Sequence, residues 1–259
     1  MTSFAAYSIG PLLNLSNIEG MVSGVYNQTL NIQLLDRSLI TCAMSNYFDM
    51  PRGIICKTPD DFRFNKKLQG GEKVYCRGGI VRFAESKLKI DLRCASVWTP
   101  ELEPNSPPSE ILLANLLENT NSEFLDFDPE ISVRNFIGRG PGLTPEGDDF
   151  LVGLLAAPML VAPSHPFGRT MAAEVTKYVP LTNDISRQML SDATLGYFIK
   201  PIIDVMAALY GNGDIESAMR KLNSVGSSSG AAMTLGVVMG VARVENHSLN
   251  MTPNQIRAA

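Results

Sequence analysis

The sequence is poor in the side chains that bind zinc and in charge of either sign. It has two histidines, His165 and His247, and its four cysteines form no CxxC pair, so we expect no metal site. Charged residues make up only 19% of the chain, and the net charge is −4 with a pI of 5.3. Such a surface has no field that attracts nucleic acid or an anionic membrane, so we expect neither as a partner.

The chain also lacks a clear membrane span. Residues 150–168 and 222–242 are uncharged, but prolines interrupt the first stretch, and serines and glycines interrupt the second. A spanning helix needs about 20 consecutive apolar residues, so both stretches are expected to be buried helices. No basic residue precedes Arg37. We therefore expect no signal or transit peptide and a cytoplasmic location, where cysteines stay reduced.

Length and composition predict two domains joined by a linker. The 259 residues are 45% hydrophobic, and four of the 16 prolines fall within residues 100–108, which excludes helix or central strand there. Residues 1–100 carry 12 Lys and Arg against 8 Asp and Glu, whereas residues 101–259 carry 10 against 18. We predict an α+β protein with a β-rich domain over 1–99, a linker over 100–108, and a helical domain over 109–259.

The first domain has the pattern of a small barrel or sandwich. Short runs rich in Val, Ile, Leu, Tyr and Cys are separated by turn sequences such as Gly70-Gly71. Residues 87–93 alternate polar and apolar side chains, as a half-buried strand does. The expected strands are 21–26, 29–35, 38–44, 53–57, 72–76, 79–84 and 87–98.

Helical periodicity dominates the second domain. Ser109 can cap the helix that follows it, and Pro145 is a favoured first residue of another. The stretch 150–161 is apolar on every face, so its helix is expected to be buried. The expected helices are 110–118, 145–162, 171–178, 184–198, 201–210, 215–223 and 230–244.

A glycine-rich loop before the buried helix is the strongest candidate site. Gly140 and Gly142 let backbone N–H groups approach a ligand, and a helix start favours an anion. Arg139 can grip a phosphate or carboxylate with two parallel hydrogen bonds. The sequence of this loop and the first turn of the helix, residues 137–150, is IGRGPGLTPEGDDF.

The end of this loop carries two adjacent carboxylates. Thr144 is a favoured N-cap, and Asp148 and Asp149 complement a helix dipole, so capping alone is one interpretation. We favour a functional role, because carboxylates at the start of a buried helix need partners. The pair can also bind Mg²⁺, although no further acidic cluster supports this.

Two more loops are candidates. The string Gly226-Ser227-Ser228-Ser229-Gly230 precedes a small-residue helix and can cradle an anion or form a tight turn. It also fits G-x-S-x-G with Ser228 as nucleophile, but that motif needs a preceding strand, and 215–223 is predicted to be helical. Thr182 and Ser186 lie one helical turn apart and can line a site or serve as a helix cap. We expect the first two loops to meet around one anion-binding site.

The string GRGPGLTPEGDDFLVGLLAA at 138–157 resembles the signature of the AllH-type subunit of oxamate carbamoyltransferase. Residues 182–196 and 225–236 are similar to two further runs of that family in the same order, and the β-rich part is similar in pattern. The family pattern has His where this chain has Ser227, and Asp where it has Ala232.

The resemblance implies carbamoyl transfer between oxalurate and phosphate, giving oxamate and carbamoyl phosphate, in ureide or allantoin catabolism. It implies FdrA-like and AllG-like partner subunits and no cofactor. Asp148, Asp149, Thr144 and Ser228 are then the expected catalytic residues. A noncatalytic binding or scaffold subunit stays open as the alternative. The expected substrate-binding residues are Arg139, Gly140, Gly142, Gly226, Ser227, Ser229, Gly230, Thr182 and Ser186.

Overall fold

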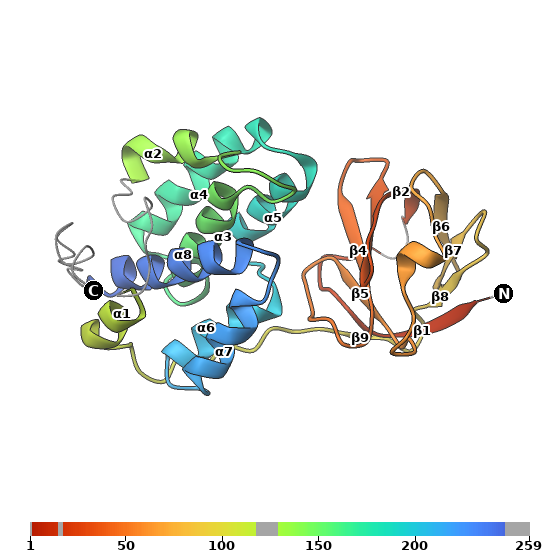
Figure 1. The fold of residues 1–259 in the computed structure, drawn as a ribbon. Helices are drawn as coiled ribbons and strands as arrows, with labels where there is room; N and C mark the ends of the chain where they lie inside the picture. The colour runs from red at the N-terminus through yellow and green to blue at the C-terminus, as the bar shows by residue number, and fades with distance from the viewer. Residues whose placement is uncertain (1, 15–17, 118–128, 247–259) are drawn as a thin grey trace. The chain divides into compact units, whose positions relative to one another are not determined.

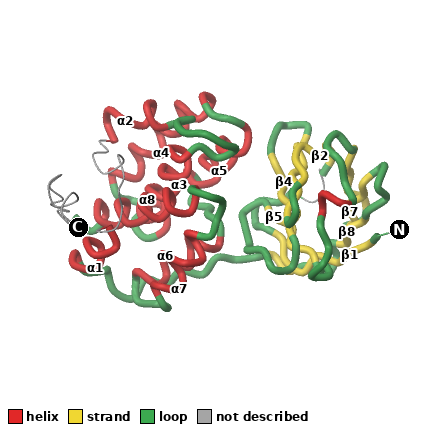
Figure 2. Tube along the Cα trace, in the orientation of Figure 1, coloured by secondary structure: helices red, strands yellow, loops and turns green. Residues whose placement is uncertain are grey.

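The computed structural model describes residues 2–14, 18–117 and 129–246. The chain forms two compact units, Met1–Pro100 and Glu101–Ala259. Figure 2 shows the strands confined to the first unit and the α-helices to the second. The α+β fold predicted from composition and periodicity is therefore confirmed.

The first unit is a closed eight-stranded β-barrel with a short ninth strand. Its strands are β1 (Ser3–Ile9), β2 (Glu19–Val25), β3 (Thr29–Leu34), β4 (Leu39–Ala43), β5 (Gly53–Cys56), β6 (Lys73–Arg77), β7 (Ile80–Phe83), β8 (Lys89–Asp91) and β9 (Ser96–Val97). The order β5-β4-β3-β2-β6-β7-β8-β1 closes because β1 pairs with β5 as well as with β8. Strand β9 adds to β1 in parallel.

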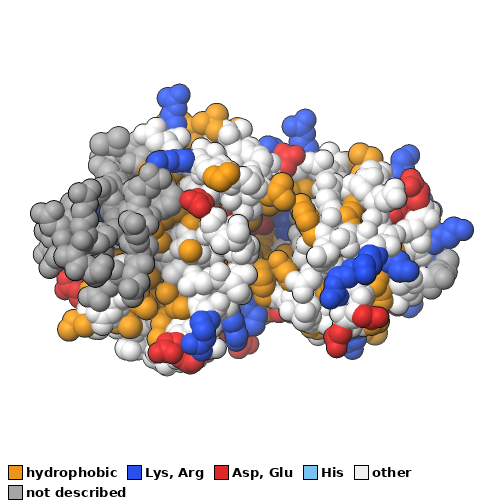
Figure 3. All heavy atoms as spheres, viewed as in Figure 1, with side chains coloured by type: hydrophobic (Ala, Val, Ile, Leu, Met, Phe, Trp, Pro, Cys, Tyr) orange, Lys and Arg blue, Asp and Glu red, His pale blue; other side chains and the backbone are white. Residues whose placement is uncertain are grey.

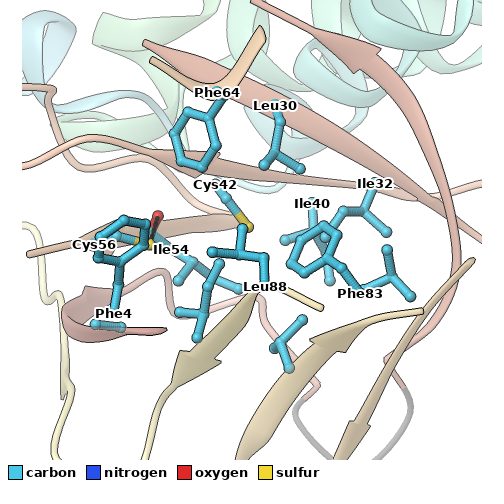
Figure 4. Packing of buried hydrophobic residues seen from close by; sticks show 14 of the residues in the cluster. Phe4, Leu30, Ile32, Ile40, Cys42, Ile54, Cys56, Phe64, Phe83 and Leu88 are labelled. Carbon is cyan, nitrogen blue, oxygen red and sulfur yellow. Dashed lines mark hydrogen bonds between the residues drawn. The ribbon is translucent and has the colours of Figure 1, made fainter. Parts of the chain in front are cut away.

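The barrel interior is filled by apolar side chains that alternate along the strands. Leu30 and Ile32 of β3 and Phe83 of β7 all point into this core (Figure 4). Cys42 and Cys56 are also buried there, and burial raises the pKa of the Cys56 thiol to about 12. The two thiols are therefore core residues with little thiolate character at neutral pH.

One strand and one α-helix of the structure were absent from the prediction. Strand β1 alternates buried and exposed residues, and this period-2 pattern was missed. Helix α2 (Pro129–Phe136) was also missed. The single strand expected over 87–98 is wrong, because the chain turns between β8 and β9, where Asp91 accepts a hydrogen bond from the backbone N–H of Arg93.

The second unit is built from helices, with one of them at its centre. Helix α3 (Glu146–Leu160) is buried along nearly its whole length, as predicted. The expected helix 184–198 ends early at Thr194, because Gly196 adopts φ +83° and terminates it. The other helices are α1 (Glu110–Leu117), α4 (Pro166–Tyr178), α5 (Asp184–Thr194), α6 (Lys200–Leu209), α7 (Ile215–Asn223) and α8 (Ser229–Val244).

Helices α3 and α8 pack side by side (Figure 1), with backbone carbonyl groups of each helix against glycines of the other. A Cβ added at Gly236 would overlap the Phe150 carbonyl oxygen, and one at Gly153 would overlap the Met233 carbonyl oxygen. One at Gly240 would lie 2.5 Å from the Leu154 carbonyl oxygen. These glycines permit the close approach, which fixes the start of α3 relative to the start of α8.

The proline-rich segment belongs to the helical unit. The backbone N–H of Asn105 donates to the Tyr210 carbonyl at 3.1 Å, and Asn212 donates to the Glu103 carbonyl. Lys and Arg side chains are visible over the barrel unit in Figure 3, in keeping with the basic balance of residues 1–100. Within the described ranges, every helix is too short or too polar to cross a membrane.

Candidate functional site

The three candidate loops meet at the starts of α3, α5 and α8. The Thr144 and Ser229 hydroxyls are hydrogen-bonded at 2.8 Å, which joins the first loop to the second. The Thr182 hydroxyl donates to Asp148 Oδ2 at 2.5 Å, which joins the first loop to the third. The expectation that the first two loops meet is confirmed, and the third loop is part of the same cluster.

Asp148 is a buried clamp between two of these loops. Its Oδ1 accepts a hydrogen bond from the backbone N–H of Gly138 at 2.8 Å, and its Oδ2 accepts the Thr182 hydroxyl. Gly138 adopts φ +74°, a left-handed conformation that glycine reaches without strain. Both carboxylate oxygens thus accept hydrogen bonds from the protein, so Asp148 joins the first loop to the third.

Asp149 is buried in the same cluster but lacks such partners. The residue is 1% exposed, and neither Oδ1 nor Oδ2 receives a hydrogen bond of normal geometry from a residue in the described ranges. Burial raises the pKa of Asp149 to about 7, the nearby Ser229 and Thr144 hydroxyls lower it, and the charges of Asp148 and Glu146 raise it. Asp149 therefore changes charge near neutral pH.

Two donors on α5 are also buried without a partner. They are Ser186 Oγ, on a residue that is 1% exposed, and Arg187 Nε. With the two Asp149 oxygens, they are all the unpaired buried side-chain polar atoms found in the described ranges, and all four lie in the first turns of α3 and α5. Because buried polar atoms are normally hydrogen-bonded, this grouping marks a place where a ligand or water would supply the missing partners.

The remaining predicted residues lie at the surface or in tight turns. Arg139 is exposed, with its guanidinium carbon 5.9 Å from the centre of the Phe136 ring, and its role in anion binding stays a prediction. Gly140 and Gly142 adopt φ +115° and +97° in the same loop. Ser227 is exposed and Ser228 is half-buried at the start of α8, after a helix rather than the strand that a nucleophile elbow needs.

Expectations about the helix starts need correction. The helix expected from Pro145 begins at Glu146, and the Thr144 side chain bonds to Ser229 instead of capping it. The N–H of Gly147 donates to the Arg139 carbonyl, and the N–H of Gly230 donates to the Val225 carbonyl, each at 2.9 Å. The N–H groups at these two helix starts were expected to have no partner within the chain and so to be available to an anion, but these two are paired. The close fit of Gly230 against the Leu222 carbonyl, beside Gly226 at φ +64°, makes this loop a tight α7–α8 turn.

Sequence reasoning missed Arg187. It directly follows Ser186, an expected substrate-binding residue. A charged residue early in a helix is typical of a solvent-exposed face, so no local pattern distinguishes Arg187. Its side chain is partly exposed, and only Nε is buried, which depends on how α5 packs within the helical unit. Within the described ranges, no group of three or more His, Cys, Asp and Glu side chains is placed to hold a metal ion.

The importance of the Asp148 clamp can be tested through Thr182. Thr182→Val removes the hydroxyl and leaves Asp148 Oδ2 buried without its donor, so we expect a loss of about 1–3 kcal/mol in the free energy of unfolding. Urea denaturation measures this. Thr176→Val is the matched control, because the Thr176 hydroxyl bonds only to the Ala172 carbonyl of its own helix, at an exposed position. Equal losses in the two variants would contradict the clamp.

Fold and site together define a two-unit α+β protein whose helical unit holds a buried carboxyl group and two buried donors, a set suited to a small polar ligand. The family model of the AllH N-terminal domain matches residues 4–97, and that of the oxamate carbamoyltransferase subunit AllH matches residues 136–241. The chain therefore belongs to the AllH family of oxamate carbamoyltransferase subunits. No solved structure matches this chain.

Proposed function

We propose that this chain carries the part of the oxamate carbamoyltransferase site that holds the amide nitrogen of oxamate and moves its proton. Membership of the family supports carbamoyl transfer. The observation that carries the residue assignment is the pair of buried Asp149 oxygens without hydrogen-bond donors in the described ranges. An amide NH₂ group supplies two N–H donors, which such a carboxylate can accept.

The reaction requires one proton transfer at that nitrogen. A phosphate oxygen attacks the carbamoyl carbon of oxalurate, a C–O bond forms, and the bond from that carbon to the oxamate nitrogen breaks. The nitrogen takes up a proton as oxamate leaves, and carbamoyl phosphate is the second product. In the opposite direction, a base removes the proton while the oxamate nitrogen attacks carbamoyl phosphate.

Asp149 has the properties of the group that moves this proton. A general acid and base works best when its pKa lies near the working pH, and burial raises the pKa of Asp149 to about 7. The carboxyl then donates to the leaving oxamate nitrogen and accepts the same proton in the reverse direction. The Thr144–Ser229 hydroxyl pair beside it supports the orientation of the carboxyl, and Asp148 holds the loops around it.

The test is the pH dependence of kcat for the chain reconstituted with its partner subunits. We expect Asp149→Asn to lower kcat by about 10²–10⁴-fold and to abolish the inflection near pH 7, because the amide cannot exchange a proton. Asp204→Asn is the matched control, since Asp204 pairs with Lys200 on α6, and its kcat is expected to be unchanged. An active Asp149→Asn enzyme with the wild-type pH profile would refute the assignment.

A scaffold role is the second candidate, and one observation favours it. The second loop holds Ser227 and Ala232 where the family pattern has His and Asp, so it offers no group that titrates near neutral pH. In this case the chain binds the metabolite or its FdrA-like and AllG-like partners, and catalysis lies elsewhere. Oxamate binding together with full activity of Asp149→Asn in the reconstituted complex would favour this role.

A further inference from the structure

Arg187 is held in place, but part of its hydrogen-bonding capacity is unused. Its Nη2 lies 2.6 Å from Asp184 Oδ1 and 3.5 Å from the Thr182 carbonyl oxygen, so the guanidinium is fixed against the start of α5. Its Nε is buried, and none of the described residues accepts a hydrogen bond from it. A buried N–H donor without an acceptor is costly, so an acceptor from outside the described residues is expected at Nε.

The contacts place this donor beside the proposed oxamate site. Thr182, whose carbonyl oxygen faces Arg187, also donates its hydroxyl to Asp148, the residue before Asp149. Ser186 precedes Arg187 on α5, and its buried hydroxyl also has no partner among the described side chains and backbone groups. Helix α5 packs on α3, the helix that carries the two unused Asp149 oxygens.

This set of groups is complementary to oxamate. The amide end of oxamate supplies N–H donors, which suit Asp149, and its carboxylate supplies acceptors, which suit a guanidinium N–H and a hydroxyl. A singly charged carboxylate also suits the electrostatics better than phosphate. Asp148, Asp149 and Glu146 lie at the start of α3 and would repel a dianion.

We propose that Arg187, assisted by the Ser186 hydroxyl, binds the carboxylate of oxamate and of the oxalyl end of oxalurate. This rests on the proposed function, because it assumes that the amide end lies at Asp149. Arg187 is then a binding residue that selects substrates with a carboxylate next to the amide. The residue chosen from sequence for an anion, Arg139, is exposed beside the Phe136 ring, and its role in anion binding stays a prediction.

The test is calorimetric titration of the full chain with its partner subunits at pH 8, using oxamate, oxamide and inorganic phosphate. Oxamide keeps the amide but has a second amide in place of the carboxylate. Arg187→Gln is expected to weaken oxamate binding by about 10- to 150-fold, the loss of a charge-assisted hydrogen bond, and oxamide binding by less than about 3-fold. Arg187→Lys keeps the positive charge but has no Nε, so its affinity for oxamate is expected to lie between those of Arg187→Gln and wild type.

Two matched variants separate recognition from folding. Arg169→Gln on α4 and Arg220→Gln on α7 each remove an exposed arginine of another helix, so both are expected to keep the wild-type ratio of oxamate to oxamide affinity. Equal weakening of oxamate and oxamide by Arg187→Gln, or no weakening of either, would overturn the proposal. Weakening of phosphate alone would overturn it too, since the anion would then be phosphate.

Failure of this inference differs from failure of the proposed function. If Asp149→Asn weakens both oxamate and oxamide while Arg187→Gln leaves their ratio unchanged, only the Arg187 assignment falls. If wild type binds neither ligand, or if Asp149→Asn binds both as wild type does, the proposed function falls and the Arg187 assignment with it.

Discussion

Asp149→Asn is expected to stabilise the protein at pH 8 while it removes the activity. The folded-state pKa of Asp149 is raised from 3.8 to about 7, mainly by burial. Between these values the unfolded chain loses the proton and the folded chain keeps it, so the wild type loses stability as the pH rises toward 7. The full effect is present above pH 7 and amounts to about 4 kcal/mol for a shift of this size.

Denaturant unfolding of wild type and Asp149→Asn at pH 4 and pH 8 measures this difference. The neutral amide has no charge to bury, so the variant is expected to gain about 4 kcal/mol over wild type at pH 8 and almost nothing at pH 4. Asp61→Asn, at an exposed position of the barrel unit, serves as the control for a simple change in net charge. A variant less stable than wild type at pH 8 would show that the carboxylate has partners in the folded protein.

Gly236→Ala is expected to destabilise the helical unit strongly and to reduce substrate binding with it. A Cβ at this position would overlap the Phe150 carbonyl oxygen, a backbone atom of α3 that no side-chain rotation can remove. Overpacking of this kind costs about 1–3 kcal/mol, which exceeds the gain of about 1 kcal/mol from replacing glycine in a helix. Separation of α3 from α8 would also move Asp149 away from Ser229.

Thermal unfolding and oxamate titration of the same variant test both parts of this prediction. Gly70→Ala is the matched control, because a Cβ there would have no neighbour closer than 3.9 Å, and its stability is expected to change by less than about 0.5 kcal/mol. A stable Gly236→Ala protein with normal oxamate binding would mean that the contact between α3 and α8 does not set the geometry of the site.

The sequence predicted the features that depend on local patterns. The apolar run after Asp149 gave the buried helix α3, and the strand-length runs before the proline-rich segment gave the barrel. The glycine-rich loop before α3 was singled out because two carboxylates there needed partners. Strand β1 was missed although its alternation is local.

The features that depend on packing could not be predicted in this way. Asp148 and Asp149 are neighbours in sequence, but successive residues point about 100° apart around a helix, so Asp148 meets Gly138 and Thr182 while Asp149 faces other groups. The partners of Asp148 come from loops on both sides of α3. The burial of Arg187 Nε likewise follows from the packing of α5 within the helical unit, which no pattern in 182–190 specifies.

The measurement that tests the central claim most directly is the affinity of the wild-type protein for oxamate between pH 5.5 and 8.5. If the ionised Asp149 accepts the amide N–H groups, affinity rises with pH, levels off above the Asp149 pKa of about 7, and loses this dependence in Asp149→Asn. Affinity that is flat across this range, or that rises identically in Asp149→Asn, would contradict the assignment of Asp149 to the oxamate amide.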